Sequence, residues 1–187
     1  MFGNRRVQWR TAGWQAARVI LPSVRDPRLV TIRRGGTLTD ADHQLLALWA
    51  AACAEHVLLL FEVDKQTDLR PRQAIAATRA WAAGRMKVME ARAADGHAMG
   101  AARPLQSAAR FAAYAAGQAA CVGHVPEHAL GAAAYAIRAA RAAGPSIAQP
   151  GRMEREWQRR QLPAPIRELV LEDQVRRNDI CWSVFVD

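Results

Sequence analysis

The chain has 187 residues and a mass of 20.5 kDa, which is enough for a single domain with its own hydrophobic core. Its 26 basic and 17 acidic residues give a formal net charge of +9, and 40 residues are alanine. Because no run of 18 apolar residues is present and no apolar stretch follows the first residues, we expect neither a membrane-spanning helix nor a secretory signal.

The three cysteines, Cys53, Cys121 and Cys181, are far apart in the sequence and form no Cys-x-x-Cys pair. An odd number of isolated cysteines is typical of buried, reduced thiols and not of a disulfide framework or a zinc site. We therefore expect a cytoplasmic protein.

Most of the positive charge lies near the N-terminus. Residues 1–36 contain eight arginines and one acid, so their net charge is +7, whereas the remaining 151 residues carry only +2. The pair Gly35-Gly36 ends this basic region and marks the best candidate boundary. We predict a basic N-terminal arm over residues 1–36 and a single helical domain over residues 37–187. The arginines of the arm are Arg5, Arg6, Arg10, Arg18, Arg25, Arg28, Arg33 and Arg34.

Within the arm, Trp9 and Trp14 argue against a fully disordered tail. Residues 28–34 alternate β-branched and other side chains, which predicts a short strand or an extended segment. No clear partner strand occurs elsewhere in the sequence, so we do not expect a sheet.

The first strong helix signal begins at Thr39, whose hydroxyl can cap a helix in which Asp42 is the third residue. Apolar residues then recur at helical spacing from Leu45 to Phe61, which predicts one helix of about six turns. After a polar linker, Pro71 opens a second helix and Gly84 ends it.

Further helices follow, each bounded by proline or glycine. Their predicted positions are residues 86–99, from Pro104 through Gly117, from Pro126 to Gly144, residues 153–161 and residues 166–177. The apolar tail at residues 180–186 is expected to dock on the body. The fold class is therefore all-α, a compact bundle of five to seven helices with short loops.

The alanines indicate close packing between these helices, and alanine is also the best helix former. In segments such as Phe111-Ala-Ala-Tyr114, small residues flank single aromatic rings. Helix backbones can then approach closely while the rings fill the remaining space. We expect a tight bundle without a large cavity, which argues against a small-molecule pocket.

The best candidate for chemistry is the segment His124-Val-Pro-Glu-His128, together with His97. Two histidines four residues apart are similar to the His-Glu-x-x-His zinc motif, but the acid is misplaced and Pro126 separates the histidines. We therefore expect His128 near a helix start and His124 on a loop, with no metal and no other cofactor. A transition-metal site formed by His97, His124 and His128 is the alternative.

The usual patterns of catalytic residues are missing from the sequence. No serine lies in a Gly-x-Ser-x-Gly elbow, and no Gly-x-x-x-x-Gly-Lys phosphate loop occurs. Glu154 and Glu156 lie among arginines, which is typical of a solvated helix with neighbouring salt bridges. Cys53 lies on the apolar side of the first helix, as a core residue would. We expect that the protein is not an enzyme.

Three parts of the sequence together resemble a bacterial family described as putative immunity proteins. They are Trp49-Ala-Ala-Ala-Cys-Ala-Glu-His-Val-Leu-Leu-Leu-Phe-Glu62, then Arg70-Pro-Arg-Gln-Ala-Ile75 with Arg79-Ala-Trp-Ala-Ala-Gly84, and His128-Ala-Leu-Gly-Ala-Ala-Ala-Tyr-Ala136. They occur in the order of the family and cover a core at residues 43–143, and residues 150–187 resemble a C-terminal helical extension of some members. The chain departs from the family pattern at Leu59-Leu60, where a proline is expected, so the first helix should be straight.

The resemblance implies a small cytoplasmic helical protein of a polymorphic toxin system, which binds and neutralises a cognate toxin domain without catalysis. Neutralisation by occlusion requires a complementary surface and no reactive group. A toxin surface that faces the basic arm is expected to be acidic.

For the partner surface, the first candidates are Asp68, Arg70 and Arg72 on the loop before the second helix, since charged loops on a rigid scaffold suit recognition. The opposite interpretation is that Arg70 and Arg72 simply pair with Asp68 and nearby acids. The second candidates are His97, His124 and His128. Nucleic-acid binding through the arginines and tryptophans of the arm is the alternative function. The oligomeric state stays open, with a homodimer as one option.

Overall fold

The structure, a computed structural model, describes residues 20–144 and 148–186. In these ranges the chain forms eight α-helices and two short 3-10 turns, with one isolated bridge between Thr31 and Leu38 and no strand. The predicted all-α fold class is confirmed, although the described helices number eight and not five to seven. No described helix combines the length and the apolar character needed to cross a membrane.

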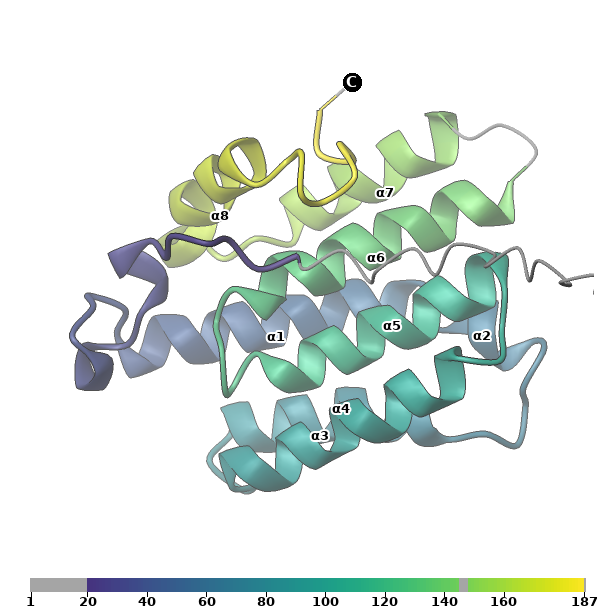
Figure 1. Cartoon of the computed structure of the whole chain (residues 1–187), viewed down its shortest axis with the longest axis horizontal. Coiled ribbons are helices and arrows are strands. Elements are labelled where there is room, and N and C mark those ends of the chain that lie inside the picture. The colour runs from purple at the N-terminus through teal and green to yellow at the C-terminus, as the bar shows by residue number, and fades with distance from the viewer. Residues whose placement is uncertain (1–19, 145–147, 187) are drawn as a thin grey trace, which may run out of the picture.

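The helices follow one another with short connections. α1 spans Asp40–His56, α2 Leu59–Glu62, α3 Arg70–Ala82, α4 Val88–Ala102, α5 Ser107–Cys121, α6 His128–Ala143, α7 Ala148–Arg160 and α8 Ala164–Arg176, while the 3-10 turns η1 and η2 span Pro27–Leu29 and Ile32–Arg34. Figure 1 shows the longer helices along the long axis of the molecule, with α3 and α4 on one side and α7 and α8 on the other.

α5 lies at the centre of the bundle and packs against α1, α3, α4 and α6. The buried residues of both α5 and α6 are mainly alanine, so their backbones lie close together as the sequence predicts. Larger side chains, among them Leu46, Phe61 and Ile137, fill the remaining core. The C-terminal tail docks on the bundle through Val184 and Phe185, as expected.

The ends of α1 and α3 show why these helices begin and stop where they do. The Thr39 hydroxyl accepts a hydrogen bond from the Asp42 backbone N–H at 3.0 Å, which confirms the predicted cap. Pro71 lies in the first turn of α3, where a backbone N–H has no helical partner. Gly84 follows α3 with a φ of 71°, a left-handed conformation that favours glycine.

The predicted continuous first helix is wrong. The chain leaves the α-helix after His56 and tightens into a 3-10-type turn, in which the Leu58 N–H donates to the Glu55 carbonyl at 3.1 Å. With three residues per turn, Leu58 and Phe61 fall on the same side, and both are buried in the core. The missing proline therefore does not straighten this region.

Residues 28–34 do not form the short strand considered from the sequence: the chain passes through the 3-10 turns η1 and η2, with only Val30 and Thr31 extended between them. The Asp26 carboxylate accepts a hydrogen bond from the Arg28 N–H at 2.8 Å, and Pro27 fixes the backbone at the start of η1. These local preferences outweigh the β-branched alternation. Pro104 and Pro126 lie in the turns before α5 and α6, not inside the helices they were predicted to open.

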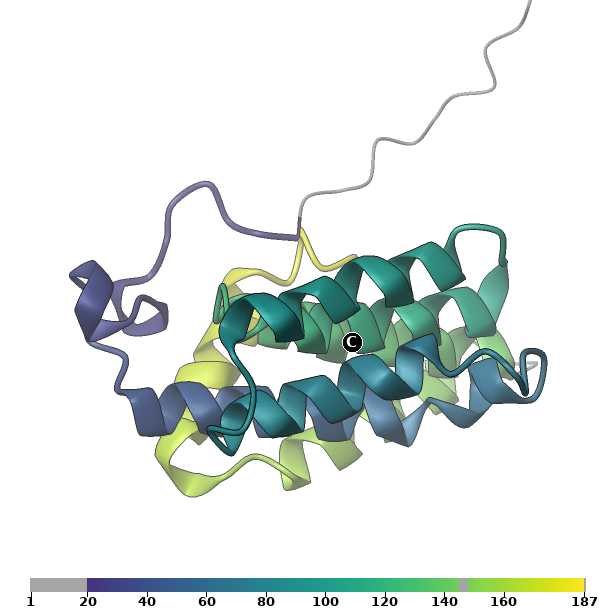
Figure 2. The same ribbon diagram turned by 90° about the horizontal axis from the view of Figure 1, so that it is seen from below.

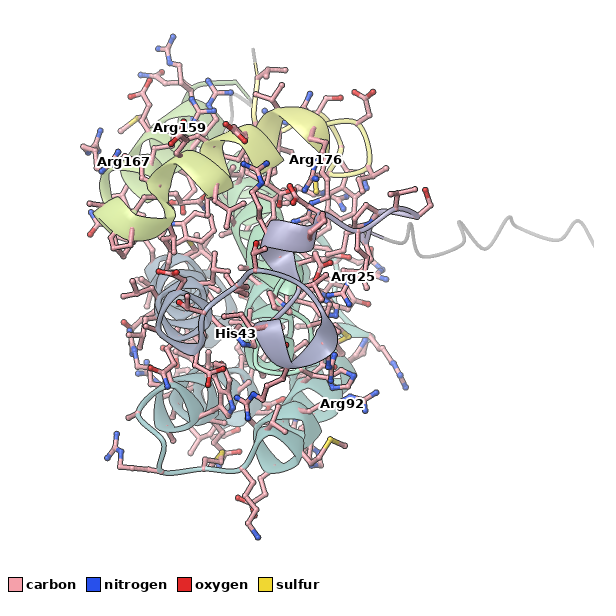
Figure 3. The ribbon with its side chains drawn as sticks, turned by 90° about the vertical axis from the view of Figure 1, so that its left-hand side faces the viewer. Arg25, His43, Arg92, Arg159, Arg167 and Arg176 are labelled. Atoms are coloured by element: carbon pink, nitrogen blue, oxygen red, sulfur yellow. The ribbon has the colours of Figure 1, made fainter. Side chains whose placement is uncertain are left out.

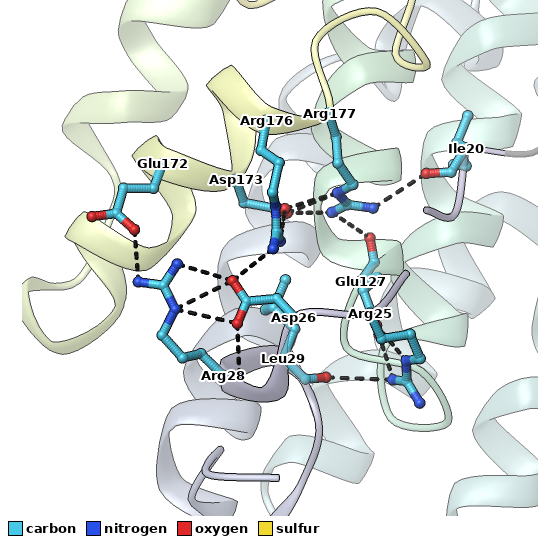
Figure 4. A network of polar contacts seen from close by, with 10 residues as sticks. All are labelled: Ile20, Arg25, Asp26, Arg28, Leu29, Glu127, Glu172, Asp173, Arg176 and Arg177. Carbon is cyan, nitrogen blue, oxygen red and sulfur yellow. Dashed lines mark hydrogen bonds and ion pairs between the residues drawn. The ribbon is translucent and has the colours of Figure 1, made fainter. Parts of the chain in front are cut away.

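The N-terminal segment, defined as residues 20–36, is bound to the bundle by a network of ion pairs (Figure 4). Arg25 forms two hydrogen bonds with the buried Glu127 of the α5–α6 loop, at 2.5 and 2.7 Å. Asp26 pairs with Arg28 at 2.9 Å and with Arg176 of α8 at 2.7 Å. The N-terminal segment lies at one end of the bundle, as Figure 2 shows, and these ion pairs hold it there.

Arg177 is the most buried cation in this network, with only 2% of the residue exposed. Its guanidinium pairs with Asp173 and donates hydrogen bonds to the carbonyls of Ile20 at 3.2 Å and Glu127 at 3.0 Å. One buried cation thus joins α8, the N-terminal segment and the α5–α6 loop. A charge at this depth is tolerated only because its donors are paired.

Candidate functional site

A cleft of about 770 Å³ opens at the end of the bundle where the N-terminal segment crosses the helix ends. Its lining comes from four parts of the chain, residues 25–34, His43 of α1, residues 81–89 and residues 123–126. Figure 3 looks onto this end and shows Arg25, His43 and Arg92 around the crossing segment. The cleft is open to solvent at the end of the bundle and is not a cavity within it. Loops and helix ends carry bulkier side chains than the alanine faces, and they leave space between them.

Trp81 forms an apolar wall of the cleft. Its indole ring lies against the backbone of Gly123, where a Cβ atom would come within 2.8 Å of the ring. The ring also contacts His43 edge-on, with 4.8 Å between the ring centroids. His43 donates its Nε2–H to the Val122 carbonyl at 2.7 Å, and burial lowers its pKa, so the ring stays neutral. Trp81 is therefore held in place before any ligand arrives.

Cationic side chains surround this wall, and no carboxylate is among the described residues that line the cleft. Two of the cations are neutralised by acids beside it. Arg25 pairs with Glu127, which raises the pKa of the Arg25 guanidinium, and Arg33 pairs with Asp40 at 2.8 Å. These two arginines therefore add little net charge to the cleft.

Arg34 and Lys87 also line the cleft, and in the described part of the chain neither has an ion pair with a carboxylate. Arg34 donates a hydrogen bond to the carbonyl of His124 at 3.2 Å. The pKa of His124 is lowered by burial first, and then by the positive charges of Arg92 and Arg34. His124 is thus neutral at pH 7, and arginine and lysine alone make the cleft positive.

The structure brings His124 and His128 close to each other and leaves His97 exposed on α4. The predicted places of His124 on a loop and of His128 at a helix start are confirmed. His128 Nδ1 lies 2.7 Å from the side-chain oxygen of Gln118, and burial lowers the pKa of His128 to about 4. Among the described residues, no group of three or more His, Cys, Asp or Glu side chains is arranged to hold a metal ion.

The predicted loop position is wrong for Arg70 and Arg72, which lie in the first turn of α3, and only Asp68 is on the loop before it. This group lies at the opposite end of α3 from the cleft. Arg70 pairs with Asp68 at 2.5 Å and lowers the pKa of that carboxyl, while Arg72 pairs with Glu62 at 2.7 Å. α3 has 13 residues, so at 1.5 Å per residue the loop is about 20 Å from the cleft. Both arginines are thus already paired with acids of this chain, as the opposite interpretation expected. A role of these residues in binding a partner stays a prediction.

The arginines of the predicted arm fall into two groups. Arg5, Arg6, Arg10 and Arg18 lie outside the described residues, as do Trp9 and Trp14. The other four, Arg25, Arg28, Arg33 and Arg34, all donate hydrogen bonds to groups of this chain. The division of the chain at residue 36 stays a prediction.

Glu154 does not have the predicted solvated position. It is 5% exposed, and its carboxylate lies 2.6 Å from Nδ1 of His56 on α1. The Trp157 ring stacks on His56 with 3.7 Å between ring centroids. Of Glu154 and Glu156, only Glu156 is exposed as predicted, and its carboxylate lies 4.0 Å from the guanidinium of Arg152. Glu154 is buried because it lies on the face of α7 that packs against the bundle.

In the described part of the chain, fold and cleft together define an all-helical protein with a positively charged cleft at one end of its bundle. The chain belongs to the family of Imm-5 like putative immunity proteins, whose family model matches residues 36–165. The matched range contains Trp81, Lys87 and His124 of the cleft and begins after Arg33 and Arg34. We find no match among curated proteins and none among solved structures.

Proposed function

We propose that this protein is an immunity protein that binds a bacterial toxin domain and neutralises it by covering part of the toxin surface. Membership of the Imm-5 like family over residues 36–165 carries this proposal. Such a role requires a stoichiometric complex and no reaction, so the proposal includes that the protein is not an enzyme.

The cleft supports this proposal because it combines features common in protein interfaces. Aromatic residues, methionine and arginine are enriched where partners bury most surface, and Trp81, Met89 and Arg34 line the cleft together. Trp81 is already fixed by Gly123 and His43, so binding loses little side-chain entropy there.

The proposal places the protein in the cytoplasm. All three cysteines are free and buried, which suits a reducing compartment. Burial raises the pKa of the Cys53 thiol, which therefore stays protonated and unreactive.

Co-expression tests the proposed function. Bacteria that produce the toxin domain encoded by the gene beside this one should stop growing, and simultaneous production of this protein should restore growth. The control is the same gene with an early stop codon, which should give no rescue. Growth arrest that persists while the full protein accumulates would refute the proposal.

A further inference from the structure

We infer that the toxin segment recognised by this protein is an acidic loop with one exposed apolar side chain, and that it docks in the cleft. This inference rests on the proposed function, to which it adds the docking site and the chemistry of the partner.

The charge of the partner follows from the cations that converge at the cleft. Arg34 comes from η2 and Lys87 from the turn between α3 and α4, and both line the cleft. Arg92 of α4 does not line it but lies near enough to lower the pKa of His124. In the described ranges of the chain, none of the three has an ion pair with a carboxylate, and Arg34 and Arg92 both act on His124. Two acids lie nearby without an ion pair to these cations: Glu90 accepts a hydrogen bond from the Lys87 backbone N–H at 3.4 Å, and Asp95 interacts electrostatically with Arg92. Like charges that have no ion pair repel one another. Carboxylates of a partner relieve that repulsion and speed association.

The apolar part of the partner follows from the wall of the cleft. Met89 is 57% exposed, and Trp81 beside it is half-buried. Methionine adapts its shape to a bound group, while the fixed indole offers a rigid apolar face. A leucine-sized or aromatic side chain of the partner can cover both and remove their apolar surface from water.

The shape of the site favours a protein loop over a nucleic acid. Nucleic-acid surfaces carry an extended basic stripe that follows the phosphate backbone. Here Arg34 and Lys87, which have no ion pair with a carboxylate among the described residues, lie in one cleft of about 770 Å³, and the neighbouring Arg25 and Arg33 are neutralised by Glu127 and Asp40. This space accommodates a few side chains of a loop.

His124 gives a direct signature of the bound acid. Its pKa is held low by burial and by Arg92 and Arg34. A carboxylate docked between these arginines opposes their charge and raises the pKa of His124. A purely structural cleft would leave this pKa unchanged on mixing with the toxin.

The inference is tested by calorimetric titration of the full chain with the toxin domain of the neighbouring gene, made inactive by substitution. Lys87→Glu and Arg34→Glu should each weaken binding at least tenfold, because each places a like charge beside the acidic loop. Arg103→Glu is the matched control, since Arg103 is an exposed arginine just after the other end of α4, and it should bind like the wild type. Melting temperatures confirm folding, and an NMR titration of His124 in the free and bound protein provides the second readout.

The outcomes separate the inference from the proposed function. If the wild type binds but both charge reversals bind equally well, or if the pKa of His124 does not rise, the docking site is wrong and the function stands. If the wild type does not bind the toxin, both fail. If a 20-nucleotide single-stranded DNA binds in the cleft with the same dependence on Lys87 and the toxin does not compete, the inferred occupant is wrong.

Discussion

His128 shows how one buried side chain links stability to pH. Burial lowers its pKa from the ordinary 6.5 to about 4, so the folded protein holds it neutral. The unfolded chain takes up a proton near pH 6.5 that the folded chain accepts only near pH 4. Between these values, each fall in pH therefore favours the unfolded state.

We predict that His128 alone lowers the free energy of unfolding by about 2 kcal/mol when the pH falls from 7 to 5. Glutamine does not titrate and can keep a hydrogen bond to Gln118. Between pH 7 and pH 5, the free energy of unfolding of His128→Gln should therefore fall by about 2 kcal/mol less than that of the wild type. Urea denaturation at pH 7, 6 and 5 measures both proteins. Part of the dependence should remain, because burial also lowers the pKa of His43. Equal losses in both proteins would show that His128 is not held neutral.

A second residue-scale prediction concerns the buried charge of Arg177. Asp173→Asn removes the carboxylate that pairs with this guanidinium and leaves the charge buried without its acid. The free energy of unfolding should fall by about 3 kcal/mol, as for other buried pairs that lose one partner. Chemical denaturation at pH 7 measures the change. Arg152→Ala, at an exposed pair of 4.0 Å, should change nothing measurable. A similarly small effect of Asp173→Asn would refute the structural role of the network.

At the scale of elements, two glycines inside helices have opposite surroundings. A Cβ atom at Gly96 of α4 would meet nothing within 4 Å, whereas at Gly131 of α6 it would lie 2.3 Å from Ile20 and 2.4 Å from Gln118. Gly131 therefore lets the N-terminal segment lie directly on α6.

Alanine at these positions should have effects of opposite sign. Gly96→Ala should raise the free energy of unfolding by about 0.5–1 kcal/mol, because alanine is the better helix former. Gly131→Ala should lower it by about 1–2 kcal/mol, since the overlap outweighs the gain in helix propensity. Thermal unfolding of both variants measures the difference. Stabilisation by both would mean that Ile20 does not pack on α6 as described.

Several elements could be predicted because their signals are local. The Thr39 cap, Pro71 in the first turn of α3 and the left-handed Gly84 each depend on the chemistry of a few adjacent residues. The break after His56 could not be predicted, because the apolar spacing continues across it and the burial of Leu58 and Phe61 decides the geometry.

The candidate site could be predicted only in part. His124 and Arg34 were candidates from the sequence because of their residue types. Trp81 and Lys87 line the same cleft only because the fold brings three distant stretches of the chain together. Glu154 was missed because hydrophobic periodicity does not register a polar residue on the inner face of a helix.

At the scale of the whole molecule, the ends of the bundle differ in their charge arrangement. At one end Arg70 and Arg72 are paired with Asp68 and Glu62, while at the other Arg34 and Lys87 line a cleft without acids among its described residues. The positive charge that dominates the N-terminal sequence is therefore partly neutralised within the fold. Of the described arginines in residues 20–36, Arg34 lines the cleft without an ion pair to a carboxylate of the described residues.

Hydrogen exchange of this protein with and without the inactive toxin domain is the most direct test of toxin docking at the cleft. Binding at the cleft should slow exchange of backbone amides at residues 31–36, 81–89 and 123–126, and leave residues 62–72 unchanged. Protection confined to residues 62–72, or no protection in the presence of excess toxin, would contradict it.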